Sequence, residues 1–128
     1  MERKIIITGT IFGMLAIILG AFGAHALKAI LTPEQLTSFE TGVRYQMYHA
    51  FFLFFVASRT ELPLKTLKVI YNLVLAGVLL FSGSIYLLTT KNVTTIDFKI
   101  IGFVTPIGGF LLIFAWFVLL LTFFKKKS

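Results

Sequence analysis

The run IIITGTIFGMLAIILGAFGA at residues 5–24 decides the fold class of this chain. It contains 20 residues and no charged side chain. Because a helix rises about 1.5 Å per residue, a run of this length matches the roughly 30 Å hydrocarbon core of a bilayer. Comparable apolar stretches cover residues 45–57, 69–88 and 100–124. The pattern predicts an all-α polytopic membrane protein with four transmembrane helices in an up-down bundle.

The composition excludes an ordinary soluble protein. Of the 128 residues, 58% are hydrophobic and 13% are charged, whereas charged residues make up about a quarter of soluble domains. A single transmembrane domain, residues 1–128, therefore fills the chain and leaves no room for a separate soluble catalytic domain. Since the chain has no cysteine, disulfides, thiolate metal sites and cysteine nucleophiles are excluded. The expected spans lie at about residues 5–26, 42–58, 69–89 and 100–124.

Lysine and arginine residues indicate the orientation of these spans. With four spans, eight of them fall on the side of the two termini and four on the other side. The positive-inside rule then places both termini in the cytoplasm and the protein in the plasma (inner) membrane. We interpret the net charge of +7 as a signal for the orientation of the spans in the membrane, and we expect no nucleic-acid partner. A signal peptide cleaved after Ala26 is the alternative, but the apolar run is longer than the 7–15 residues usual for such a segment.

The sequence Thr32-Pro33-Glu34-Gln35 predicts a helix start, with a capping hydroxyl, proline at the first helical position and glutamine three residues after the cap. Polar and apolar residues then alternate with helical spacing. Residues 33–41 are expected to form a short interfacial helix, or else to continue directly into the second span. The sequence leaves both alternatives open.

The second span contains unusually many polar residues. Its strictly apolar part, residues 50–57, would cover only about 12 Å, so the span has to begin near Gly42. His49 then lies about one turn inside the membrane boundary, where an ionisable group costs a few kcal/mol and needs a partner. His49 therefore either bonds to a neighbouring helix and only fixes the packing, or it has a functional role. Glu40 is expected to pair with Arg44, one turn later.

The fourth segment contains Thr105-Pro106-Ile107-Gly108-Gly109. This pattern is typical of a helix start, or of a kink if the helix already begins near Ile100. In the first case residues 96–104 are a half-buried connection. Trp116 falls near the middle of the membrane, so we expect it to pack against other helices. Small residues that allow close approach of helices are expected at Gly9, Gly13, Gly20, Gly83, Gly108 and Gly109.

Four sequence blocks, in order along the chain, resemble a known family. The blocks are Gly20-Ala21-Phe22-Gly23-Ala24-His25, Thr41-Gly42 with Tyr45-Gln46 and His49, Phe81-Ser82-Gly83-Ser84-Ile85-Tyr86, and Thr105-Pro106-Ile107-Gly108-Gly109. They are similar to the signature blocks of the YgdD/YwdK-like family of small four-helix membrane proteins. One departure is Ala115, where the family typically has glycine before the tryptophan. The resemblance implies an integral membrane protein and supplies no function.

All four blocks are expected to converge on the outer half of the bundle, where polar side chains would form a pocket. The candidate lining residues are His25, Arg44, Tyr45, Gln46, His49, Asn72, Tyr86 and Thr105. Such a pocket favours a non-enzymatic binding, assembly or membrane-stabilising protein, whose partners would be the bilayer, a lipid headgroup, another membrane protein or a second copy of the chain. We predict no cofactor.

Two further functions remain as alternatives. The first is a small transporter or channel in which His25 and His49 carry protons or a small cation or solute. The second is an enzyme, for which the sequence offers no catalytic residues. No aspartate or glutamate lies within a span, and two histidines provide at best half of a zinc site.

Overall fold

The computed structural model describes residues 1–89 and 98–125, with side-chain environments for all of these except 98–101. Within the described residues every secondary-structure element is a helix and there is no strand, as predicted. The elements are α1 (Glu2–His25), the short 3-10 helix η1 (Leu27–Ala29), α2 (Pro33–Ser58), α3 (Leu64–Thr89) and α4 (Phe98–Lys125).

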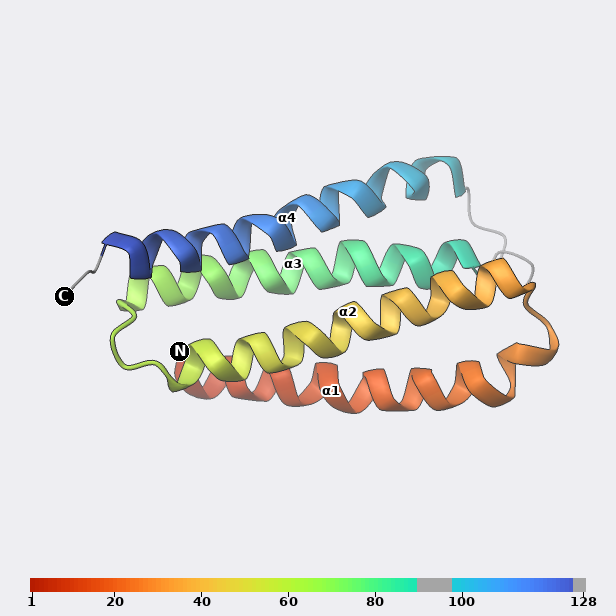
Figure 1. The fold of residues 1–128 in the computed structure, drawn as a ribbon, viewed down its shortest axis with the longest axis horizontal. Helices are drawn as coiled ribbons and strands as arrows, with labels where there is room; N and C mark the ends of the chain where they lie inside the picture. The colour runs from red at the N-terminus through yellow and green to blue at the C-terminus, as the bar shows by residue number, and fades with distance from the viewer. Residues whose placement is uncertain (90–97, 126–128) are drawn as a thin grey trace.

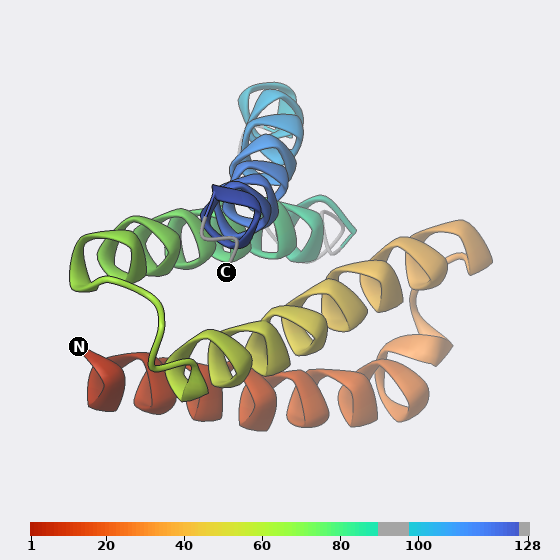
Figure 2. The same cartoon turned by 60° about the vertical axis from the view of Figure 1, so that its left-hand side comes forward.

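The four long helices run up and down in chain order (Figure 1). α1 packs on α2, α2 on α3, and α3 on α4. Both termini and the connection from α2 to α3 lie at one end, which we call the termini end, while the connection from α1 to α2 lies at the opposite, far end (Figure 1). Figure 2 shows that α4 is steeply inclined to α3, so the bundle is open rather than square in section.

Among the described residues, three helices are long and apolar enough to cross a membrane, at Glu2–Ala29, Leu64–Thr89 and Gly102–Lys125. α2 is not among them because its first half is polar. Nevertheless α1 ends at the far end and α3 begins at the termini end (Figure 1), so the chain has to return through α2. With 26 residues, α2 is long enough to do so.

The start of α2 has the predicted cap. Thr32 accepts a hydrogen bond from the Gln35 backbone N–H (3.1 Å), and the Gln35 side chain accepts one from the Thr32 N–H (3.0 Å). These reciprocal bonds satisfy two of the free N–H groups of the first turn. From there α2 continues without a break to Ser58. The structure therefore has one long helix instead of a separate interfacial helix at residues 33–41.

α4 begins at Phe98 and runs through Pro106. Of the two alternatives, the structure confirms a helix that has already begun before Pro106; the other, a helix start at Thr105 with a connection over residues 96–104, is wrong for residues 98–104. Residues 96 and 97 lie outside the described residues. Because proline has no N–H, the Gly102 carbonyl lacks its usual donor one turn later.

The apolar core contains residues from all four helices. Ile5, Leu53, Val74 and Ala115 are fully buried, at 0% exposure. They belong to one contiguous cluster, which draws on the early part of α1 and the late parts of α2 and α4. The core therefore lies toward the termini end.

Glycines set the closest approach between α3 and α4. A Cβ atom on Gly108 would lie 2.3 Å from the Phe81 backbone nitrogen, and one on Gly77 would lie 2.6 Å from Leu112. Around Gly83 no atom lies within 4 Å of such a Cβ, so the packing contact expected there is not made. The other expected positions, Gly9, Gly13, Gly20 and Gly109, have neighbours at 2.8, 3.8, 3.5 and 3.4 Å.

Candidate functional site

Gln46 connects three helices near the middle of the bundle. Its Nε2 donates to the Phe12 carbonyl of α1 (2.8 Å), and its Oε1 accepts from the Tyr86 hydroxyl of α3 (2.7 Å). The side chain is only 4% exposed. A buried amide with both ends bonded in this way avoids the cost of unpaired polar atoms in an apolar environment.

Two serines of α3 extend this network. Ser82 donates to the Gly42 carbonyl of α2 at 2.7 Å, and Ser84 hydrogen-bonds with Thr105 of α4. Gly42 allows α2 and α3 to approach each other this closely, because a Cβ atom at this position would lie 2.9 Å from the Tyr86 ring. These polar residues therefore join the helices to one another.

His49 is buried, at 3% exposure, and both of its ring nitrogens are engaged. Trp116 Nε1 donates to His49 Nε2 (3.0 Å), and His49 Nδ1 lies 2.7 Å from the Tyr45 carbonyl. Since an indole N–H can only donate and a carbonyl can only accept, the proton of the neutral ring is on Nδ1. Trp116 also packs against Phe52, with ring centroids 4.3 Å apart, so the expected contact with another helix is made, although Trp116 is still 50% exposed.

Three of the expected pocket residues are not part of these contacts. His25 is exposed at the end of α1, and Asn72 is exposed in the half of α3 near the termini end. Arg44 is also exposed and donates to the Thr41 hydroxyl at 3.2 Å. In the described part of the chain Arg44 does not pair with Glu40, contrary to expectation. The predicted set is therefore divided among different places.

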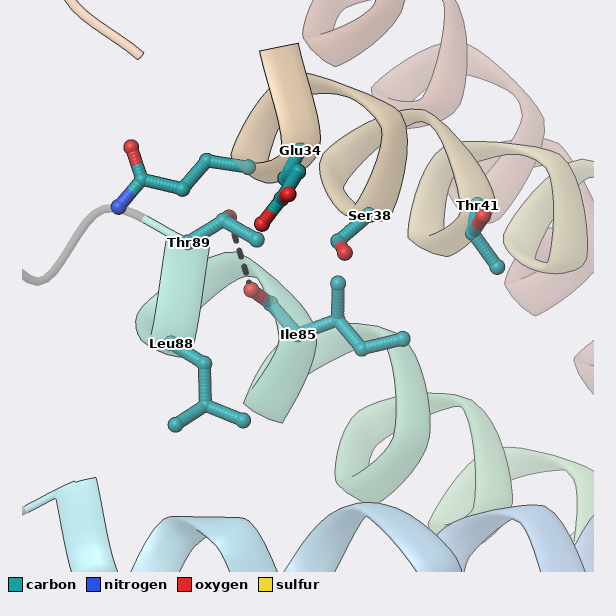
Figure 3. A pocket seen from close by; sticks show the side chains of 7 residues that line it. Glu34, Ser38, Thr41, Ile85, Leu88 and Thr89 are labelled. Atoms are coloured by element: carbon teal, nitrogen blue, oxygen red, sulfur yellow. Dashed lines mark hydrogen bonds between the residues drawn. The ribbon is translucent and has the colours of Figure 1, made fainter. Parts of the chain in front are cut away.

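Two of the cavities formed by the described residues lie along α2. The outer cavity, at the far end, has a volume of about 470 Å³ and is lined by Glu34, Gln35, Ser38, Thr41, Ile85, Leu88 and Thr89. Figure 3 shows Glu34 and Ser38 of α2 facing Ile85 and Thr89 of α3 across it. The inner cavity has a volume of about 360 Å³ and is lined by Thr41, Tyr45, His49, Phe81, Gly109, Leu112, Ile113 and Trp116.

Thr41 lines both cavities, so we treat them together as the α2 groove. Its floor is a stripe of α2 with helical spacing, formed by Glu34, Ser38, Thr41, Tyr45 and His49. From the first to the last of these residues the stripe covers about 22 Å. The groove is polar at the far end and mostly apolar further in. From the sequence, Tyr45 and His49 were expected to line a pocket. Glu34, Ser38 and Thr41 were not, although their spacing of three and four residues was visible.

The electrostatics of the groove follow from two exposed groups. Glu34 lines the outer cavity and makes no hydrogen bond or ion pair with any described residue. The Arg44 guanidinium lines neither cavity but donates to Thr41, which lines both, so it lies at the edge of the groove. The arrangement offers an acid in the outer cavity, a cation at the edge of the groove beside Thr41 and a mostly apolar inner cavity.

Comparison with known proteins gives the family. The model of the family described as "Protein of unknown function (DUF423)" matches residues 19–109. UPF0382 membrane protein YwdK of Bacillus subtilis is 38% identical over 125 residues, which cover 96% of this chain and 98% of that protein.

Two further relatives cover nearly the whole chain. A UPF0382 membrane protein of Haemophilus influenzae is 35% identical over 128 residues, 100% of this chain and 99% of its own. UPF0382 membrane protein SAB0533 of Staphylococcus aureus is 35% identical over 123 residues, 96% of this chain and 97% of its own. No solved structure matches. These matches confirm the resemblance noted in the sequence: the chain belongs to the DUF423 family of UPF0382 membrane proteins.

Proposed function

We propose that this protein is a non-enzymatic membrane protein that binds a lipid in the α2 groove. The observation that carries the proposal is the polarity of the groove, which changes from Glu34 and Ser38 at the far end to Phe81 and Ile113 further in. A lipid has the same gradient from headgroup to acyl chain. Membrane proteins bind headgroups through charged side chains near the interface.

The hydrogen bonds of the site favour binding over transport. His49 would carry a proton or hold a cation only after losing its bond to Trp116 or to the Tyr45 carbonyl. Gln46 is bonded at both ends as well. Groups satisfied in this way stabilise helix contacts and leave the groove itself as the place for a ligand.

The proposed orientation has the termini end in the cytoplasm and the far end outside, because most lysine and arginine residues lie at the termini end. Since the chain has no cysteine, single cysteines report on each side. A cysteine at Ala29 should react with an impermeant maleimide added to intact cells, and one at Thr60 only after lysis. The reverse pattern would invert the orientation.

Lipid binding is tested by filling the inner cavity. Gly109 lines this cavity, and Gly109→Leu should lower the amount of phospholipid that stays on the protein after mild detergent extraction, measured by native mass spectrometry. Gly102→Leu is the matched control on the same helix, because no atom lies within 4 Å of a Cβ there. Equal retention in both variants and the wild type, or no retained lipid in the wild type, would contradict the proposal.

A further inference from the structure

The charged groups along the α2 groove occur in a fixed order. Arg44 lies at the edge of the groove, where its guanidinium donates to Thr41, the residue that lines both cavities. Glu34 lies in the outer cavity, about two turns closer to the helix start than Thr41. None of the described residues lining the outer cavity is a lysine or an arginine. A ligand that fills the groove therefore meets first an apolar channel, then a cation and finally an acid.

Glu34 takes no part in the capping box of α2, and it favours the helix start only through the helix dipole. The capping box of Thr32 and Gln35 already satisfies two of the free N–H groups of the first turn. The carboxylate has no partner among the described residues, and Figure 3 shows it in the cavity beside Thr89. The hydroxyl of Ser38 lies next to it on the same wall of the cavity (Figure 3). A carboxylate in these surroundings is suited to a ligand that carries N–H donors and a positive charge.

We propose that the α2 groove selects an aminophospholipid, a lipid whose headgroup has a phosphate followed by a primary ammonium. This inference rests on the proposed function and names its ligand. The phosphate lies beside Arg44 and Thr41, the ammonium lies on the Glu34 carboxylate and Ser38, and one acyl chain lies along Tyr45 and Phe81. The order of groups in the lipid is the order of groups along the groove.

Other lipids match the groove less well. A phospholipid with a glycerol headgroup places no cation near Glu34 and leaves that carboxylate beside a net negative headgroup. A choline headgroup carries the positive charge but has no N–H to donate. A free phosphoethanolamine has the polar groups but no chain for the inner cavity. The three comparisons separate the contributions of charge, hydrogen bonding and the apolar channel.

The test is a competition between phosphatidylethanolamine, phosphatidylglycerol and phosphatidylcholine with identical acyl chains. The delipidated full-length protein is titrated with equimolar mixtures, and bound lipid is identified by native mass spectrometry. We expect phosphatidylethanolamine to be favoured by about tenfold over each competitor, the ratio that one charge-assisted hydrogen bond provides. Glu34→Gln should reduce this ratio to about one.

Two further variants act as controls. Glu40→Gln removes an exposed carboxylate from the same helix, outside both cavities, and should leave the tenfold preference unchanged. Arg44→Gln should lower the occupancy of all three phospholipids together, because they share the phosphate. The circular dichroism spectrum and melting temperature of each variant show whether it is folded.

The outcomes separate the two proposals. Binding of all three lipids with equal affinity, a preference for phosphatidylglycerol, or a preference that persists in Glu34→Gln would overturn the inference and leave lipid binding in place. Absence of any bound phospholipid in the wild-type protein would overturn the proposed function itself. Loss of the preference in Glu40→Gln as well as in Glu34→Gln would assign the effect to overall charge and also overturn the inference.

Discussion

Replacing Gly108 by alanine should separate α4 from α3. The added Cβ would lie 2.3 Å from the Phe81 nitrogen and 2.7 Å from the Leu80 carbonyl carbon, and both are backbone atoms that cannot rotate away. Ordinary contact begins at 3.4 Å, so the gap has to open by 3.4 − 2.3 = 1.1 Å. A shift of this size removes a quarter to a half of the dispersion energy of each affected contact.

The expected cost is about 1–3 kcal/mol, as for other overpacked sites. Gly109→Ala is the matched control, since its Cβ would meet only the Phe81 ring, at 3.4 and 3.6 Å. Both variants gain the same helix propensity, about 1 kcal/mol, and this gain cancels in the comparison. Gly108→Ala should therefore be less stable than Gly109→Ala by about 1–3 kcal/mol.

The assay is reversible unfolding in mixed detergent micelles with increasing sodium dodecyl sulfate, followed by circular dichroism and by Trp116 fluorescence. Trp116 lies on α4 and contacts Phe52 and His49 of α2, so its emission should also shift in Gly108→Ala. If the two alanine variants unfold at the same detergent fraction with unchanged emission, the close contact between α3 and α4 is wrong.

Three further predictions concern the helix contacts. Gln46→Leu removes two interhelical hydrogen bonds and should lower the free energy of unfolding by about 1–3 kcal/mol; an unchanged unfolding curve would contradict the bonding scheme. Trp116→Phe keeps a ring against Phe52 but loses the donor to His49, so it should cost about 1 kcal/mol and change the nitrogen-15 shift of the His49 ring in NMR spectra. Gly83→Ala meets open space and should leave stability within about 0.5 kcal/mol, which a melting curve checks.

The helices themselves were largely predictable from the sequence. Apolar length identified the spans of α1, α3 and α4, and Thr32 with Gln35 identified the start of α2, because both signals are local. Pro106 was ambiguous, since proline fits the first turn of a helix as well as the inside of a kinked one. Only the packing of α4 on α3 distinguishes these cases, and packing is not visible in the sequence.

The rotation of each helix about its axis was the part that sequence analysis missed. A membrane helix that is apolar all round has no polar face to mark its exposed side, so Gly83 and Gly108 looked alike although only Gly108 contacts a neighbouring helix. Asn72 was grouped with Tyr86 by spacing, but it lies in the first half of α3, near the termini end, and is exposed. The hydrogen-bond partner of the buried His49 could not be predicted, because this partner is Trp116, which lies 67 residues away in the sequence.

A photo-crosslinking measurement tests lipid binding in the α2 groove most directly. A photoreactive phenylalanine analogue replaces Tyr45, which lines the inner cavity, or Tyr48, which is exposed one turn later and lines neither cavity. After irradiation in native membranes, mass spectrometry of the denatured protein identifies covalently attached lipid. Our account predicts phosphatidylethanolamine adducts at Tyr45, enriched over the bulk membrane, and adducts at Tyr48 that follow the bulk composition. Identical adducts at both positions would contradict it.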